Sequence, residues 1–165
     1  MKTANRISYT FGINISKIRS RLKIISTLAI TLQIVPVLAD CTFTGVSGIN
    51  FGQYSALDIA ANNTGVGSIS ISCQGVGPQR VIGLSTGQSN NFDARIMTSG
   101  ANQINYNLYT NSARTLIWGD GNGASKSISV SDSVLTTLNI FGQIPANQDA
   151  SVGQYSDSII VTIDF

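Results

Sequence analysis

Apolar and polar side chains alternate along the last eleven residues of the chain, where Tyr155, Ile159, Val161, Ile163 and Phe165 fall on one face at a spacing of two. This pattern predicts a β-strand, because successive side chains of a strand point to opposite faces. An apolar terminal strand has to be paired and covered, since its free backbone groups would otherwise recruit another chain. We therefore expect the function to depend on strand pairing rather than on catalysis.

The same spacing of two recurs in short apolar runs throughout the region that follows residue 40. It is clearest in GSISISC, where Ile69, Ile71 and Cys73 alternate with serines. The pattern predicts strands at 42–46, 49–54, 67–73, 80–85, 104–110, 115–118, 126–130, 134–144 and 154–165. Turn-forming residues separate these runs, notably at 75–78, 89–91, 111–112, 120–123, 145–147 and 152–153. We predict one all-β domain, an immunoglobulin-like β-sandwich of two sheets.

The first 39 residues have a different composition and predict a secretory signal peptide. Six basic residues and no acidic one are followed by an uncharged run at 24–39. These 16 residues are fewer than the ~18 expected of a membrane-spanning helix. Val37-Leu38-Ala39 suits cleavage, which would leave a mature domain of residues 40–165. The alternative is an anchoring N-terminal helix that stays attached.

Removal of the leader reverses the sign of the net charge. Residues 40–165 contain Arg80, Arg95, Arg114 and Lys126 against eight aspartates, a net charge of −4. A mildly acidic domain with scattered cations lacks the basic surface that nucleic acids or anionic membranes require. We expect no nucleic-acid partner and no stable membrane insertion.

The residue types also argue against catalysis, because the chain has no histidine and no glutamate to act as a general base. We predict a non-enzymatic protein without cofactor or metal.

The loop 120–123 (DGNG) has oxygen ligands for calcium but lacks the later bidentate glutamate, so a hairpin turn is the preferred interpretation. The glycosylation pattern at 62–64 is frequent by chance. Tyr54, Tyr106, Tyr109 and Trp118 fit either a sugar-stacking surface or core packing.

Cys41 and Cys73 both lie in the predicted mature domain. In an exported chain an even pair predicts a disulfide, which would tie the first strand to a later one. Free thiols or a metal site are the alternative, but the chain offers no histidine and no third cysteine as a further ligand.

Three stretches together resemble the spore coat protein U family, whose members include subunits of archaic, Csu-type chaperone-usher pili. They are GINFGQYSALD at 48–58 leading through GVGSISISCQG to Gly75, INYNLYTNSARTLIWGDG at 104–121, and IFGQIPANQDASVGQYSDSIIVTIDF at 140–165. The middle stretch is the most specific, and with the cysteine pair the resemblance spans essentially the whole predicted mature domain.

The resemblance implies an incomplete sandwich, with one strand missing and an apolar groove left open. A periplasmic chaperone would lend a strand, an outer-membrane usher would assemble the fibre, and another pilus subunit would replace the chaperone. The terminal residues Ile159, Val161, Ile163 and Phe165 would border the groove and contact the chaperone. Cys41 and Cys73 match the family's bridged pair. The motif residues expected to serve packing and turn geometry are Asn105, Tyr106, Asn107, Tyr109, Arg114 and Trp118.

One departure from the family pattern concerns the donor strand. The predicted cleavage leaves only Asp40 ahead of Cys41, so we expect a subunit that accepts a strand and has none to donate.

The leading hypothesis is an exported pilus or coat subunit at the cell surface that supports adhesion and biofilm formation. The alternative is a self-contained secreted carbohydrate-binding or coat module.

Overall fold

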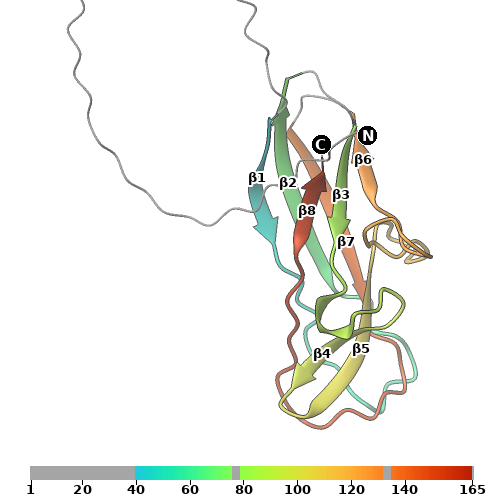
Figure 1. The fold of residues 1–165 in the computed structure, drawn as a ribbon. Helices are drawn as coiled ribbons and strands as arrows, with labels where there is room; N and C mark the ends of the chain where they lie inside the picture. The colour runs from blue at the N-terminus through green and yellow to red at the C-terminus, as the bar shows by residue number, and fades with distance from the viewer. Residues whose placement is uncertain (1–39, 76–78, 132–134, 165) are drawn as a thin grey trace, which may run out of the picture. The chain divides into compact units, whose positions relative to one another are not determined.

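The computed structural model describes residues 40–75, 79–131 and 135–164, and these form two antiparallel β-sheets (Figure 1). The strands are β1 (Asp40–Ser47), β2 (Val66–Gln74), β3 (Arg80–Leu84), β4 (Arg95–Ser99), β5 (Asn102–Tyr109), β6 (Ile128–Val130), β7 (Leu135–Gln143) and β8 (Val161–Asp164). One short 3₁₀ helix, η1 (Gly87–Ser89), follows β3. The first sheet has the order β1-β2-β7-β5-β4 and the second the order β6-β3-β8. The predicted all-β, two-sheet sandwich is confirmed.

The interior of the five-stranded sheet follows the alternation in β2. Ile69 and Ile71 are almost completely buried, while the serines between them are only partly covered. Because β2 lies between β1 and β7, both of its backbone edges are hydrogen-bonded. A strand with two satisfied edges and one apolar face is well suited to the centre of a sandwich.

A disulfide joins β1 to β2. Cys41 and Cys73 are directly opposite in the ladder and form the bond that the sequence predicted. The ladder has an irregularity between Phe43 and Gly45, which resembles a β-bulge. β1 pairs with β2 alone among the described strands, so the disulfide fastens an edge strand to its neighbour.

The second sheet is built around β3, which pairs with β6 on one side and β8 on the other. Trp118 packs between the sheets with none of its surface exposed, and its indole Nε1–H donates to the carbonyl of Ile82 at 3.1 Å. Leu84 and Leu108 complete this part of the core. The tryptophan therefore links the two layers by packing and by one buried hydrogen bond.

Two predicted strands are wrong. Residues 49–54 form an irregular segment, and residues 115–118 make only isolated bridges, Tyr109 with Ile117 and Trp118 with Lys126. In the first segment Phe51 is buried although its neighbours are not, and side-chain hydrogen bonds from Asn62 and Thr64 to the carbonyl of Phe51 hold the segment in place of a ladder. The second segment lies in a tight connection whose hydrogen bonds go to different neighbours.

β4 was not predicted, because Arg95 and the polar residues Thr98 and Ser99 obscure its pattern. The terminal strand is shorter than the predicted 154–165, since ladder pairing with β3 begins only at Val161. The segment before it has one bridge, between Ser156 and Thr98.

Several expected turns use backbone conformations that asparagine and glycine tolerate. Asn90 and Asn147 have φ of 56° within predicted turns, and Gly121 and Gly123 have φ of 91° and 61°.

The predicted leader and the last residue, Phe165, lie outside the described residues. In the part of the chain that is described, no helix is long and apolar enough to cross a membrane.

Candidate functional site

A groove of about 1390 Å³ lies alongside the inner face of the five-stranded sheet. One wall comes from the end of β1 and the segment that follows it, residues 46–56, and the other from the segment that leads into β8, residues 150–157 with Ile159 and Val161. The floor comes from residues of β3, β4, β5 and β7. We call this feature the open groove.

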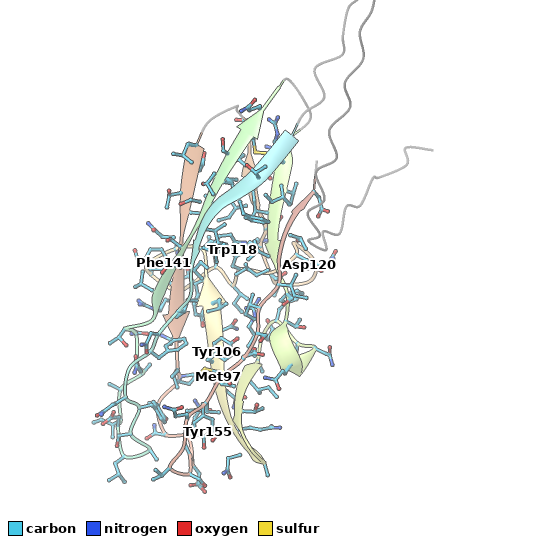
Figure 2. The ribbon with its side chains drawn as sticks, turned by 90° about the vertical axis from the view of Figure 1, so that its left-hand side faces the viewer. Met97, Tyr106, Trp118, Asp120, Phe141 and Tyr155 are labelled. Atoms are coloured by element: carbon cyan, nitrogen blue, oxygen red, sulfur yellow. A yellow bond between two sulfur atoms is a disulfide. The ribbon has the colours of Figure 1, made fainter. Side chains whose placement is uncertain are left out.

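The floor of the open groove is mainly apolar. Its members are Leu84, Met97, Ile104, Tyr106, Leu108, Ile140 and Ile144. Figure 2 views this side of the domain, with Met97 and Tyr106 close together and Tyr155 below them. The ring of Phe51 packs edge-on against that of Tyr106, with centroids 5.9 Å apart. Each of these side chains is at most 9% exposed, so the floor is apolar and is already largely covered by the two walls.

Phe51 depends on two glycines that lie beneath its ring. A Cβ on Gly65 would approach the Phe51 ring to 2.5 Å, and one on Gly142 would approach it to 2.6 Å. Both separations are too short for real atoms, so any side chain at these positions would displace the ring from the groove. The first glycine of GVGSISISC and the glycine of IFGQIP therefore allow this wall of the groove to pack as it does.

The terminal segment has the alternation that its sequence predicted. Tyr155, Ile159, Val161 and Ile163 are half-buried and pack against the core, while Ile160 is 66% exposed. Ile159 and Val161 line the open groove. Ile163 packs against the core without being part of the groove lining, and Phe165 lies outside the described residues.

β8 has an open backbone edge within the described part of the chain. It pairs with β3 in the register Val161 with Leu84 and Ile163 with Ile82, and the amide of Ser85 donates to the carbonyl of Ile160 at 2.9 Å. Hydrogen-bonded and non-hydrogen-bonded pairs alternate in an antiparallel ladder. The backbone groups of Val161 and Ile163 therefore face away from β3, on the unpaired side.

Side-chain hydrogen bonds hold the segment before β8 in place. The hydroxyl of Tyr106 donates to Asp157 Oδ2 at 2.7 Å, and Asp157 Oδ1 accepts from the amide and side chain of Gln88 at 3.2 and 3.1 Å. Burial, with a smaller effect from the bond to Asp157, raises the pKa of Tyr106 well above its usual range. Tyr106 therefore remains a neutral donor and fixes Asp157 at the edge of the groove.

Three of the predicted motif residues support the backbone from buried or half-buried positions. Asn107 is buried and donates from Nδ2 to the carbonyl of Phe92 at 2.8 Å. Arg114, with φ of 56°, donates to the carbonyls of Gly142, Ser112 and Asn63. Tyr109 is half-buried beside β7, and its hydroxyl lies 3.5 Å from Gln143 Oε1. These residues hold loops against β5 and β7.

The remaining motif residues separate into an exposed and a buried group. Asn105 is exposed, but its backbone N–H and C=O are both bonded by Gln148, at 2.7 and 2.9 Å. Tyr106 is only 4% exposed and Trp118 is completely buried. The predicted alternative of a sugar-stacking surface is therefore wrong for Tyr106 and Trp118. Tyr54 bridges two loops, since its hydroxyl donates to Pro145 and accepts from the amide of Gln148.

Arg95 is a central residue that the sequence pattern did not indicate. It is completely buried on β4 and donates to Asn107 Oδ1 at 2.7 Å, to the carbonyl of Trp118 at 2.6 Å, and twice to the carbonyl of Ser85. The ring of Phe92 lies 5.3 Å from its guanidinium carbon. Burial lowers the pKa of Arg95 from its usual value. A charged residue in an apolar pattern usually indicates a solvated face, so only the fold reveals its burial.

The candidate calcium loop is organised by its own hydrogen bonds. Asp120 accepts from the backbone and side-chain amides of Asn122, both at 2.9 Å, and from Ser125 at 3.3 Å. The bonds from Asn122 lower the pKa of Asp120. In the described residues, no group of three or more candidate metal-binding side chains is present.

Asn62, in the glycosylation pattern, donates from its side-chain amide to the carbonyls of Phe51 and Gln53.

Comparisons with known proteins identify a family and a related fold. The model of the Spore Coat Protein U domain matches residues 25–162. The crystal structure of the CsuC–CsuE chaperone–tip adhesion subunit pre-assembly complex, from archaic chaperone-usher Csu pili of Acinetobacter baumannii, matches with a TM-score of 0.52 and 24% identity. That match covers 78% of this chain and only 40% of the other.

A weaker structural match is the E. coli Hda pilus minor tip subunit, HdaB, with a TM-score of 0.38 and 11% identity over 76% of this chain and 82% of that chain. No curated protein matches the sequence.

Proposed function

This chain belongs to the Spore Coat Protein U domain family, and we propose that it is an exported structural subunit of a chaperone-usher fibre. Its open groove accepts an extended strand, first from a periplasmic chaperone and then from another subunit, on an outer-membrane usher. The fibre supports adhesion to surfaces and biofilm formation. The observation that carries the proposal is a β8 edge that no other described strand pairs with, next to a groove with an apolar floor.

Strand addition explains both parts of this combination. The backbone groups of Val161 and Ile163 that face away from β3 are donors and acceptors for a new ladder. Each additional main-chain hydrogen bond contributes about 1 kcal/mol. Alternate side chains of the incoming strand would point into the groove, toward half-buried lining residues such as Ile49, Ile159 and Val161. Each buried aliphatic side chain adds about 1.5–3 kcal/mol.

The match to the Csu complex supports the proposed partners. The Csu structure is named as a complex of a chaperone with a tip adhesion subunit, and this chain shares that fold at a low level of identity. Export follows from the predicted leader at 1–39. A non-enzymatic role follows from the residue composition, since the chain has neither histidine nor glutamate.

The test is co-purification of the full chain, expressed with its own leader, with the chaperone encoded nearest to its gene. Val161→Asp places a charge at a half-buried position in the groove and should abolish capture. Ile160→Asp is the matched control, because Ile160 is 66% exposed on the opposite face of the same segment. We expect the control to retain the chaperone. A wild-type protein that is monomeric, fully folded and indifferent to the chaperone would refute strand acceptance.

Adhesion and biofilm formation require a separate assay in the native host. Cells that produce the Val161→Asp variant should lose surface fibres and form less biofilm, whereas Ile160→Asp cells should resemble the wild type. Normal fibres in the Val161→Asp strain would exclude the groove from assembly.

A further inference from the structure

The ladder between β3 and the terminal segment stops at an unusual place. Ser85 and Ile160 lie opposite each other, at a position where an antiparallel pair normally exchanges two backbone hydrogen bonds. The amide of Ser85 does donate to the carbonyl of Ile160, at 2.9 Å. The amide of Ile160, however, donates to the side-chain hydroxyl of Ser85, also at 2.9 Å. One of the two expected main-chain bonds has been replaced.

Arg95 explains the replacement. Its Nε and Nη2 donate to the carbonyl oxygen of Ser85 at 3.1 and 2.8 Å, so this oxygen is already bonded by a charged group. Charge-assisted hydrogen bonds are stronger than neutral ones, and the fork of a guanidinium is rigid. The carbonyl of Ser85 is therefore directed to the interior, and the amide of Ile160 takes the hydroxyl instead.

The path of the chain changes at this point. C-terminal to Ile160 the segment belongs to the sheet of β3, from Val161 onward. Before it, Ser156 exchanges two backbone bonds with Thr98 of β4, each 3.0 Å long. The same segment therefore passes from one sheet to the other while it forms a wall of the open groove.

We propose that Arg95 is a positioning residue for the open groove: by occupying the carbonyl of Ser85, it ends the β3–β8 ladder at Val161 and holds the preceding segment between the two sheets. The inference rests on the proposed function of the groove. Stability alone is a poor explanation for Arg95, because a well-packed apolar residue at a buried site usually serves at least as well as a buried ion. Its partners are neutral oxygens, from Asn107, Trp118 and Ser85.

The test compares Arg95→Met with Arg80→Met in the full chain. Arg80 is the matched control, because it is also buried and donates to backbone carbonyls, those of Gln74 and Gly75, but is not part of the groove lining. Two quantities are measured on folded protein. The first is the hydrogen-exchange rate of the Ile160 amide. The second is the affinity for a fluorescent ten-residue peptide in which valine alternates with threonine between terminal lysines.

In Arg95→Met the amide of Ile160 should gain the backbone carbonyl of Ser85, so its exchange should slow by about tenfold. Because the wall of the groove moves with it, peptide affinity should fall by about tenfold. Arg80→Met should change both by less than about twofold, even where its thermal stability falls. A folded Arg95→Met protein with wild-type exchange at Ile160 and wild-type affinity would overturn the proposal.

A measurement on the wild-type protein decides the matter if Arg95→Met does not fold. The Nε–H of Arg95 should exchange slowly and show NMR coupling across the hydrogen bond to the carbonyl carbon of Ser85, and a rapidly exchanging Nε–H would contradict the proposal. If the wild type fails to bind the peptide, the proposed function of the groove is wrong, and the exchange rate of Ile160 then tests the role of Arg95 by itself.

Discussion

Removal of the disulfide between Cys41 and Cys73 should greatly destabilise the domain. The two residues are separated by 32 positions, and for a loop of this size the chain-entropy relation predicts a loss of ~3.7 kcal/mol at 25 °C. A domain of this length should then unfold ~15 °C lower. The physical reason is the unfolded state, because the broken crosslink allows it many more conformations.

The assay is equilibrium urea unfolding of the exported protein and of a Cys41→Ala/Cys73→Ala double variant. Far-ultraviolet circular dichroism follows the strands, and Trp118 fluorescence follows the core, since this only tryptophan of the chain is completely buried. The denaturant slope should increase, because the unfolded chain without a crosslink exposes more surface. Reduced wild-type protein is the control for the packing of Cys73, which is 3% exposed.

The reasoning has a clear point of failure. If the double variant and the reduced wild type both lose less than ~1 kcal/mol with an unchanged denaturant slope, the crosslink does not restrict the unfolded chain as argued. Free thiols in the exported protein would show that the bond does not form in the compartment in which the chain folds.

Substitutions at three further positions test separate parts of the structure. Trp118→Phe removes the indole N–H that bonds the carbonyl of Ile82 and should cost about 1–3 kcal/mol in urea unfolding; a loss below the experimental error would contradict the buried bond. Arg114→Ala abolishes the bonds to three carbonyls and should cost about 2 kcal/mol, whereas Arg114→Gly should recover part of that loss through its tolerance of positive φ. Equal stability of the two Arg114 variants would argue against a strained backbone. The pKa of Asp120 is lowered in the folded state, so the stability that its carboxylate contributes is complete above the unfolded pKa and is lost as the pH falls through the folded pKa. Asp120→Asn should therefore weaken the acid dependence of the urea midpoint. An identical pH profile in this variant would refute the lowered pKa of Asp120.

The alternation of side chains was sufficient to predict the class of fold and most of its strands. β2 and β8 were predicted on the correct faces, because each has one apolar side and one polar side. The disulfide could be predicted from the count of cysteines and the leader. These features depend on local pattern or on simple arithmetic, and so they can be read without the fold.

The features that the sequence did not reveal depend on contacts between distant residues. Phe51 looks like a member of a strand, but its ring lies over Gly65 and Gly142, which come from other parts of the chain. Arg95 looks like a surface charge, yet carbonyls from Ser85 and Trp118 surround it. Because the environments of both residues depend on these distant contacts, the groove could be expected only in outline.

The open backbone edge of β8 has a consequence for selectivity. Main-chain hydrogen bonds are the same for every amino acid except proline, so this edge by itself cannot discriminate between one extended chain and another. Under the proposed function, two ligands of unrelated sequence could therefore occupy the same place in succession, provided that both alternate correctly. Preference for either one would then come from how closely its side chains match the half-buried lining residues, such as Ile49, Ile159 and Val161.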